Sequence, residues 1–570
     1  MKYFSKKIFC LIIIFILFFI PSILSIETQT KNDDILKINF EGTTDSSSNA
    51  NIKITEVKGG LRLSTTIENQ GNIDYHNIQI LTRITGKFII PPKVRNHEII
   101  KLTVLGENST KLIEDKIFGL GTVQISIGLK ISDEERIIGQ VKAFVIGNFI
   151  IILKKILNEN NIYNGYTLFT PEYSTHTYLI NNAGAVIHSW NCNYIQGMGI
   201  LLLENGNLVR CDWSTTPNAK FLTGGITGHV GIYAPNGTQV WDFTYSNDQY
   251  CLHHDIEVLP NGNFLMSAFE YINKEEAIQN GKDPNQLYMG RLCPDKIIEV
   301  RPTGKTTGEI VWEWHAMDHI IQDYDETKDN YGDVKSHPEL IDLNYGKTRY
   351  DWTHINSIDY NEEFDQILLC SRELSEIWII DHSTSTEEAT GHTGGRYGKG
   401  GDLLYRWGNP QVYRAGDEED RQLFYPHDAE WIESDCPGEG NILVFNNKNV
   451  LEDEPNPGIN EYSTVDEIIP PVDYNGHYYK IGLAYGPLNP TWSYYNEEDP
   501  HDFYSTHLSG ALRLPNGNTL ICEGGKGKFF EVTPEKGIVW EYENPYGTPN
   551  HVFDIYCYSP DYPGIKILLD

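Results

Sequence analysis

The sequence predicts an all-β protein, and three repeated features support this prediction. Apolar and polar side chains alternate in short runs such as 51–57 and 61–67, which is typical of strands buried on one face. A Leu followed by an Asn-Gly turn occurs at 203–207, 259–263 and 514–518, and Asn-Gly favours tight β-hairpins. Six tryptophans recur at spacings of about 50 to 95 residues, namely Trp190, Trp241, Trp312, Trp407, Trp492 and Trp540.

These repeats predict a six-bladed β-propeller over residues 163–570, with one of the tryptophans in each blade. The first strand of the propeller, 165–169, is expected to close the ring against strands near the C-terminus. Residues 27–150 are predicted to form a separate immunoglobulin-like β-sandwich, because about seven short strands separated by Gly and Asn turns fit into that length.

Residues 1–25 have the three-part plan of a secretory signal. Lysines precede an apolar run over 8–20, and Pro21 and small residues follow it. The run is shorter than the roughly 20 apolar residues that a membrane-spanning helix needs. A retained N-terminal membrane anchor is the alternative to a cleaved signal. In both cases we expect an exported protein, extracellular or at the cell surface, and periplasmic if the cell has an outer membrane.

Composition narrows the functional classes. A hydrophobic content of 40% with 12% aromatic residues is typical of a globular protein. The 45 basic and 78 acidic side chains give a net charge of −33, which argues against a nucleic-acid partner and against docking on anionic lipid. The eight cysteines beyond the signal are scattered without a CxxC pair, so a cysteine zinc site is not expected. The sequence leaves disulfide pairing open, and it leaves both a monomer and a homodimer open.

Three histidines each open an alternating run, at His254, His354 and His427. Because alternate residues of a strand face the same side, Asn356 is expected to share the face of His354. If the runs are the innermost strands of three blades, the three imidazoles converge at one mouth of the central channel. Asp255 and Asp428 directly follow their histidines, so the alternation predicts that they point away from the channel and hold neighbouring backbone.

Arg372 is expected to join this group through the hairpin that begins at His354. Three His, one Arg and one Asn without an inward carboxylate suit an anion such as a sulfuryl or phosphoryl group. A neutral His can also attack sulfur or phosphorus itself. Two alternatives stay open: three His can bind zinc, although the Arg372 cation opposes this, and the histidines can be structural groups in a binding propeller.

Four stretches, 353–360, 371–378, 425–431 and 507–518, resemble the PAPS-independent arylsulfate sulfotransferases, and the similarity covers about residues 163–557. The resemblance implies an exported six-bladed propeller with an N-terminal β-sandwich. It also implies a ping-pong transfer of a sulfuryl group from an aryl sulfate donor to a phenolic acceptor, without a cofactor and without a metal.

Carried over by motif, the resemblance makes His427 the nucleophile that becomes sulfo-histidine. His254, His354 and Arg372 would bind the sulfuryl and phenolic oxygens, and His254 or His354 would act as the acid and base. Asn356 would support them.

Aromatic residues near the expected mouth, Trp352, Tyr425 and Trp431, are candidates to stack on an aryl donor. The alternatives to a sulfotransferase are a non-catalytic ligand- or surface-binding propeller, and a hydrolase in which water replaces the phenol.

Overall fold

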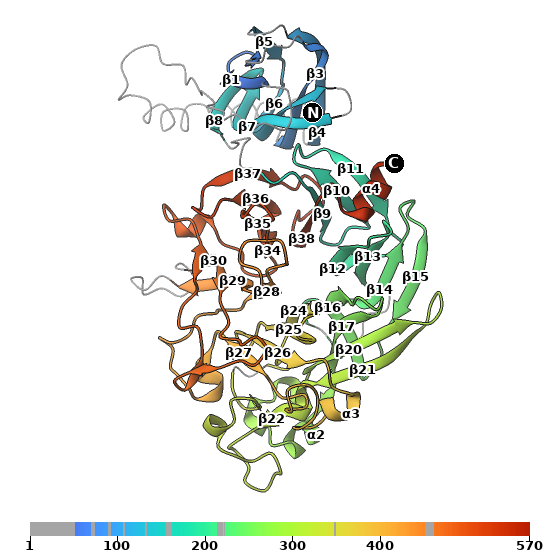
Figure 1. Ribbon diagram of the computed structural model, residues 1–570, viewed down its shortest axis with the longest axis vertical. Helices are drawn as coiled ribbons and strands as arrows, with labels where there is room; N and C mark the ends of the chain where they lie inside the picture. Colours follow the sequence, from blue (N-terminus) through green and yellow to red (C-terminus); the bar gives the residue numbers. More distant parts are fainter. Residues whose placement is uncertain are drawn as a thin grey trace, which may run out of the picture.

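The computed structural model describes residues 52–570 except 70–74, 89–92, 106–108, 132–133, 156–161, 214–219, 222, 347–348 and 451–460. The predicted signal therefore lies outside the described residues. Nearly all regular structure in the described part is β, as predicted (Figure 1). None of the helices found there is long and apolar enough to cross a membrane.

Two antiparallel sheets with a common apolar core form the N-terminal part. The smaller sheet contains β1 (Ile52–Lys58), β2 (Leu63–Asn69) and β5 (Thr110–Asp115). The larger sheet has the order β4 (Lys93–Leu105), β3 (Tyr75–Phe88), β6 (Gly119–Ile131), β7 (Glu134–Gly147) and β8 (Phe149–Lys155). Several strands are longer than predicted, and β8 runs past the predicted boundary at residue 150.

Six four-stranded antiparallel sheets follow in the described part of the chain. The first contains β11 (Val186–Asn191), β10 (His176–Asn181), β9 (Tyr166–Pro171) and β38 (Val552–Tyr558). The second contains β12 (Gln196–Leu202), β13 (Leu208–Trp213), β14 (Gly228–Tyr233) and β15 (Gln239–Thr244). The third contains β16 (Tyr250–Val258), β17 (Phe264–Glu270), β20 (Asp295–Pro302) and β21 (Gly308–His315).

The other three sheets have the same plan. The fourth contains β24 (Ile355–Asn361), β25 (Gln366–Ser371), β26 (Glu376–Asp381) and β27 (Tyr405–Trp407). The fifth contains β28 (His427–Trp431), β29 (Ile442–Val450), β30 (Glu461–Ile468) and β33 (Trp492–Tyr494). The sixth contains β34 (Gly510–Arg513), β35 (Thr519–Glu523), β36 (Lys528–Val532) and β37 (Ile538–Glu543).

The strands β38, β12, β16, β24, β28 and β34 lie together at the centre of the sheets (Figure 1), and each contacts the next, with β34 contacting β38 in turn. The last of these strands along the chain, β38, pairs with β9, which contains the 165–169 run. The expected pairing of the first strand with the C-terminal strand is therefore present.

All six tryptophans of the repeat lie in the outermost strands, β11, β15, β21, β27, β33 and β37. The three Asn-Gly motifs form the hairpins between the first and second strands of their sheets. At Gly206, Gly262 and Gly517 the φ angles are 79°, 82° and 87°, which is why glycine is needed in these turns.

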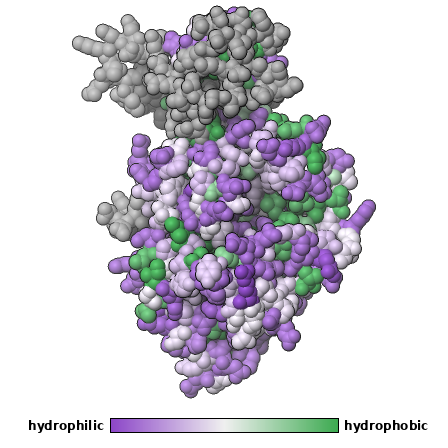
Figure 2. Space-filling view, in the orientation of Figure 1, coloured by the Kyte–Doolittle hydropathy of each residue, from purple (hydrophilic) through white to green (hydrophobic). Residues whose placement is uncertain are grey.

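Helix is scarce among the described residues, with α2 (Lys274–Gln279), α3 (Thr386–Ala389) and α4 (Pro563–Leu569). The N-terminal sheets meet the outer strand β37, where Lys142 Nζ lies 3.2 Å from Glu543 Oε1. On the face in Figure 2 hydrophilic side chains predominate and hydrophobic ones form separate smaller patches, in keeping with the large acidic excess.

Candidate active site

His254 and His354 meet where the central strands β16 and β24 approach each other. Their ring centroids are 4.6 Å apart and the rings meet edge to face. Each residue has a φ of 50° and lies at or beside a break in the pairing register of its strand. Such bulges re-aim side chains, and left-handed backbone at a bulky residue is a strained conformation that clusters at functional sites.

The three histidines do not occupy equivalent strand positions, although each one opens an alternating run in the sequence. In three of the sheets a side chain of the central strand accepts a hydrogen bond from the backbone N–H of the next central strand. The pairs are Asp255 with Ile358 at 2.9 Å, Ser357 with Ala429 at 2.9 Å and Asp428 with Ala511 at 2.8 Å. The preceding residues, His254, Asn356 and His427, are therefore equivalent, and His354 lies two residues earlier in its sheet.

A carboxylate supports His354, contrary to the expectation of no carboxylate in this group. His354 Nδ1 lies 2.6 Å from Asp351 Oδ2, and Thr223 donates a hydrogen bond to the same oxygen. Burial alone would raise the pKa of Asp351, but the charge of His354 and its hydrogen bond outweigh burial and lower that pKa. Asp351 lies before β24 begins, so strand alternation could not place it.

His253 and His254 point in different directions. The ring of His253 stacks on Phe269 at 3.7 Å, and its Nε2 lies 2.6 Å from Asp295 Oδ1. His253 Nδ1 lies 2.8 Å from His254 Nδ1, and Gly225 backbone lies so close to the His254 ring that a Cβ there would overlap it. Burial, followed by the charge of neighbouring His354, holds the pKa of His254 well below its usual value.

His427 begins β28 and is fixed by an amide that the sequence analysis missed. Its Nδ1 lies 2.7 Å from Asn447 Oδ1. The Asn447 amide nitrogen donates to the carbonyls of Ser505 at 2.9 Å and Leu508 at 3.0 Å, so the amide oxygen must face the imidazole. Burial, and after it the Arg372 cation, holds the pKa of His427 well below its usual value.

Arg372 follows β25 and lies close enough to affect both His254 and His427 electrostatically. Its guanidinium carbon is 5.0 Å from the centroid of the Tyr425 ring, and it forms an ion pair with Glu373. A half-buried cation beside two buried neutral imidazoles gives this end of the central strands side chains of the kind that bind anions.

The remaining predicted residues differ in position. The Asn356 amide donates to the Pro426 carbonyl at 2.8 Å, so it holds the backbone just before His427. Trp352 and Tyr425 line a small pocket of about 100 Å³ together with Asp351. Trp431 lies at the far end of β28 from His427, where it lines a different cavity, and the structure does not bring it to the histidines.

The sequence model of the arylsulfotransferase (ASST) family matches residues 153–555, which is more than half of the 570-residue chain. The chain belongs to the ASST family. The family assignment predicted from the motifs is therefore confirmed, and an aryl sulfotransferase activity is what the family suggests.

Comparisons with individual proteins are less informative for this ASST-family protein. No curated protein matches it. Among solved structures, a protein of unknown function from Bacteroides caccae is 12% identical, covering 70% of this chain and 99% of that one, with a TM-score of 0.39. A luciferin-regenerating enzyme is 8% identical, covering 70% and 94%, with a TM-score of 0.29. Apo AztD from Citrobacter koseri is 8% identical, covering 84% and 98%, with a TM-score of 0.27. Similarities this low carry no argument about activity.

Two groups of side chains in the described part of this ASST-family protein are close enough to share a metal ion. One consists of Asp428, Glu430 and Asp554, and the other of His319, His392 and Asp402. The three histidines of the candidate site do not form such a group. Carboxylate oxygens of Asp428 and Asp554 lie within 4.8 Å of each other, although β34 separates their central strands β28 and β38, so the prediction that Asp428 points away from the centre is wrong. The predicted hydrogen bonds of Asp255 and Asp428 to neighbouring backbone are present.

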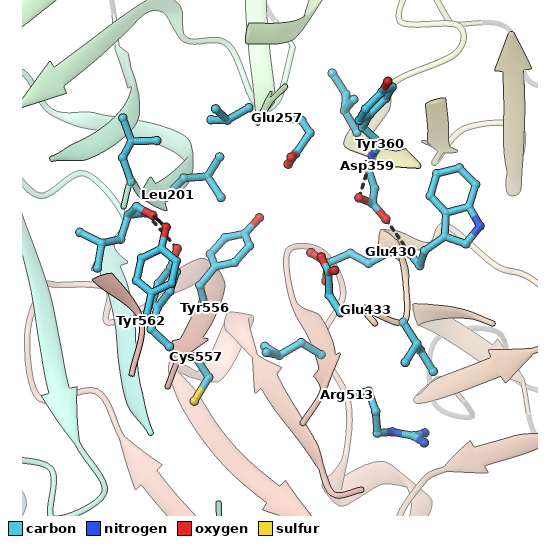
Figure 3. A pocket seen from close by; sticks show the side chains of 18 of the residues that line it. Leu201, Glu257, Asp359, Tyr360, Glu430, Glu433, Arg513, Tyr556, Cys557 and Tyr562 are labelled. Atoms are coloured by element: carbon cyan, nitrogen blue, oxygen red, sulfur yellow. Dashed lines mark hydrogen bonds between the residues drawn. The ribbon is translucent and has the colours of Figure 1, made fainter. Parts of the chain in front are cut away.

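A large cavity lies at the other end of the central strands. Its volume is about 830 Å³, and the carboxyl groups of Glu257, Asp359 and Glu430 point into it from three different strands (Figure 3). Burial is the main cause that raises the pKa of Asp359 to about 8 and the pKa of Asp428 to about 7. Burial and the neighbouring carboxylates raise the pKa of Glu430 well above its usual value.

These carboxyl groups predict a pH-dependent stability. A folded-state pKa above the unfolded value means that the folded protein binds more protons, so the stability that these groups contribute is greatest in acid and falls between about pH 4 and pH 8. Glu430→Gln removes one charge at nearly constant volume. We expect it to raise the free energy of unfolding at pH 8 by about 1–2 kcal/mol and to have little effect at pH 5. Urea unfolding of both proteins at the two pH values measures the difference.

The matched control is Glu439→Gln, because Glu439 is exposed in the turn that follows β28. It should change stability equally little at both pH values. If Glu430→Gln raises the free energy of unfolding no more at pH 8 than at pH 5, these carboxyl groups are solvated in the cavity.

Proposed function

We propose that this protein is an exported aryl sulfotransferase that moves a sulfuryl group from an aryl sulfate to a phenol by a ping-pong route through sulfo-His427. Family membership supports the reaction class. The observation that supports His427 as the nucleophile is its contact with Asn447. An amide oxygen only accepts hydrogen bonds, so Nδ1 carries the proton and Nε2 keeps its lone pair.

The electrostatics of His427 favour attack. Because its pKa is held well below the usual value, the imidazole is neutral at pH 7 and nucleophilic. In the first half-reaction the Nε2–S bond forms while the bond between sulfur and the aryl oxygen breaks, and the electron pair leaves on the phenolate oxygen. Arg372 and His254 donate hydrogen bonds to the sulfuryl oxygens, where negative charge is concentrated.

His354 is the acid and base of the proposed route. Asp351 Oδ2, 2.6 Å from Nδ1, accepts a hydrogen bond from this nitrogen and orients the ring. The imidazolium gives its Nε2 proton to the departing phenolate. In the second half-reaction the acceptor phenol returns a proton to Nε2 of His354, and the phenol oxygen bonds to sulfur. The bond between sulfur and Nε2 of His427 breaks at the same time, which restores the starting protein.

The proposal includes an architecture and a location. We infer that the six four-stranded sheets are the blades of a β-propeller whose central strands carry the site at one mouth, and that the N-terminal pair of sheets is an immunoglobulin-like sandwich. Export follows from the signal-like residues 1–25, which lie outside the described residues.

Mass spectrometry after brief exposure to 4-nitrophenyl sulfate tests the proposal. We expect an adduct of about 80 Da, a sulfuryl group, on the peptide that contains His427, and its loss when phenol is added. The His427→Asn protein should acquire no adduct. His501→Asn, which changes an exposed histidine, should acquire the same adduct as the unmodified protein.

Other outcomes identify the alternatives. If the folded protein neither forms the adduct nor releases 4-nitrophenol, the non-catalytic binding propeller is the better explanation. Release of 4-nitrophenol at the same rate with and without phenol, with inorganic sulfate as the product, would identify a hydrolase.

A further inference from the structure

A second cluster of chemically reactive side chains lies outside the candidate active site. His319 ends the short 3₁₀ helix 316–319, while His392 and Asp402 lie in the loop that follows α3 (Figure 1). One ring nitrogen of each histidine and a carboxylate oxygen of Asp402 all lie within 4.8 Å of one another. His319 Nδ1 is 2.9 Å, and His392 Nδ1 2.7 Å, from the same oxygen, Asp402 Oδ1.

The hydrogen bonds of His319 determine which of its nitrogens carries a proton. Nε2 lies 2.8 Å from the carbonyl oxygen of Ala389. A carbonyl only accepts, so Nε2 is the donor, and in the neutral ring Nδ1 then holds a lone pair. That lone pair faces Asp402 Oδ1, a carboxylate oxygen that carries lone pairs and no proton. The contact is repulsive unless a positive charge lies between the two atoms.

Several features favour a metal ion over a proton as that charge. A backbone carbonyl that holds the far nitrogen of a histidine is the usual support of a metal-bound imidazole. His319 is fully buried, so its orientation is fixed by the protein around it. Its ring lies parallel to that of Trp314 at 5.5 Å, and Trp314 donates to the Gly401 carbonyl at 2.7 Å, so an ordered wall holds the ring in place.

The cluster is also accessible. The His392 side chain is 59% exposed, whereas those of His319 and Asp402 are 0% and 7% exposed. An ion can therefore enter from the side of His392 and keep a water molecule as a fourth ligand. Two imidazoles and one carboxylate suit Zn²⁺ better than Ca²⁺ or Mg²⁺, which prefer oxygen ligands.

We propose that His319, His392 and Asp402 bind a Zn²⁺ ion that fastens the loop after α3 to the 316–319 turn. The ion replaces the missing positive charge between His319 Nδ1 and Asp402. Its role is structural, because the cluster shares no residue with the candidate active site.

Metal content and thermal stability test this site without reference to sulfuryl transfer. The full-length protein is treated with EDTA, dialysed against ZnCl₂ and analysed by inductively coupled plasma mass spectrometry. We expect about one Zn²⁺ per chain, and a Tm about 3 °C or more above that of the metal-free protein at Zn²⁺ well above Kd. MgCl₂ and CaCl₂ should give no comparable increase.

His392→Ala is the informative variant, because its exposed side chain can be removed without disturbing the metal-free fold. It should weaken Zn²⁺ binding at least about 10-fold and abolish the Tm increase. His337→Ala is the matched control, since His337 is a half-exposed histidine 3.0 Å from a single carboxylate, Glu339. It should bind Zn²⁺ as the unmodified protein does.

Two results would overturn the proposal. One is an unmodified, folded protein that retains no Zn²⁺ after dialysis, which would make the cluster a protonated ion pair. The other is an unchanged Zn²⁺ content and Tm increase in His392→Ala, which would place the ion elsewhere in the chain.

Discussion

Replacing His427 with Asn is expected to lower the rate of sulfuryl transfer by about 10⁴-fold or more, because the proposed covalent route loses its nucleophile. The amide nitrogen of Asn can take the place of His427 Nδ1 and still pair with Asn447, but Asn has no basic nitrogen where Nε2 stands. Release of 4-nitrophenol from 4-nitrophenyl sulfate in the presence of phenol measures the rate. Circular dichroism and Tm should show that the variant remains folded.

A second variant tests whether the loss of activity is specific to His427. His501→Asn, on the exposed surface, should transfer at the unmodified rate. If His427→Asn keeps more than about a tenth of the activity, the nucleophile is not His427, and an adduct on the peptide of His254 or His354 would identify its replacement.

Arg372→Ala is expected to slow transfer by about 10²–10³-fold, the usual cost of removing one donor that stabilises developing negative charge. It should also change the pH dependence of the residual activity. Arg372 is, after burial, the main cause that lowers the pKa of His427. Without this cation the pKa rises toward its ordinary value, so the neutral, reactive imidazole forms only at higher pH. The acid limb of the rate profile should therefore move to higher pH.

Arg372→Lys separates charge from geometry. Lys keeps the positive charge, so the acid limb of the rate profile should stay near its original position. It cannot form the bidentate hydrogen bonds of a guanidinium with an oxyanion, so the rate of transfer should remain reduced. An Arg372→Ala protein with an unchanged rate and an unshifted acid limb would remove Arg372 from the site.

The sheets could be predicted because their signals are local. A Leu followed by Asn-Gly needs only a few residues to specify a hairpin, and all three such motifs form one. The recurring tryptophans also mark one structural position, the outermost strand of each sheet. The lengths of the N-terminal strands were less predictable, because β3 and β4 continue through residues that weaken the alternation, such as Gly86 and Asn96.

The arrangement of the candidate site was predictable only in part. The sequence analysis expected His254 and His354 to converge, and their rings do meet. Alternation failed at the bulges, where one extra residue changes which side chains share a face. It therefore misplaced Asp428 and hid the equivalence of Asn356 with His254 and His427. Trp431 was misplaced for a simpler reason, since each residue of a strand adds about 3.3 Å and the strand carries it away from His427.

Asn447 shows what a sequence analysis could still recover. It lies two residues beyond Phe445, the residue that pairs with His427 across the β28–β29 hairpin. Pairing the two strands backward from their connecting turn would have placed an amide beside the imidazole. The same procedure could not have found Asp351, whose position depends on the turn before β24.

The pairing of β9 with β38 affects how the protein is made. The strands of the other five four-stranded sheets lie between β9 and β38 in the sequence. A ribosome must therefore deliver nearly every residue before β9 acquires β38 as a partner. Until then β9 presents an unpaired edge, the kind of surface through which incomplete chains associate with one another. A chain that stops before residue 552 would keep that edge permanently and would be a substrate for aggregation or proteolysis, however complete its histidine cluster.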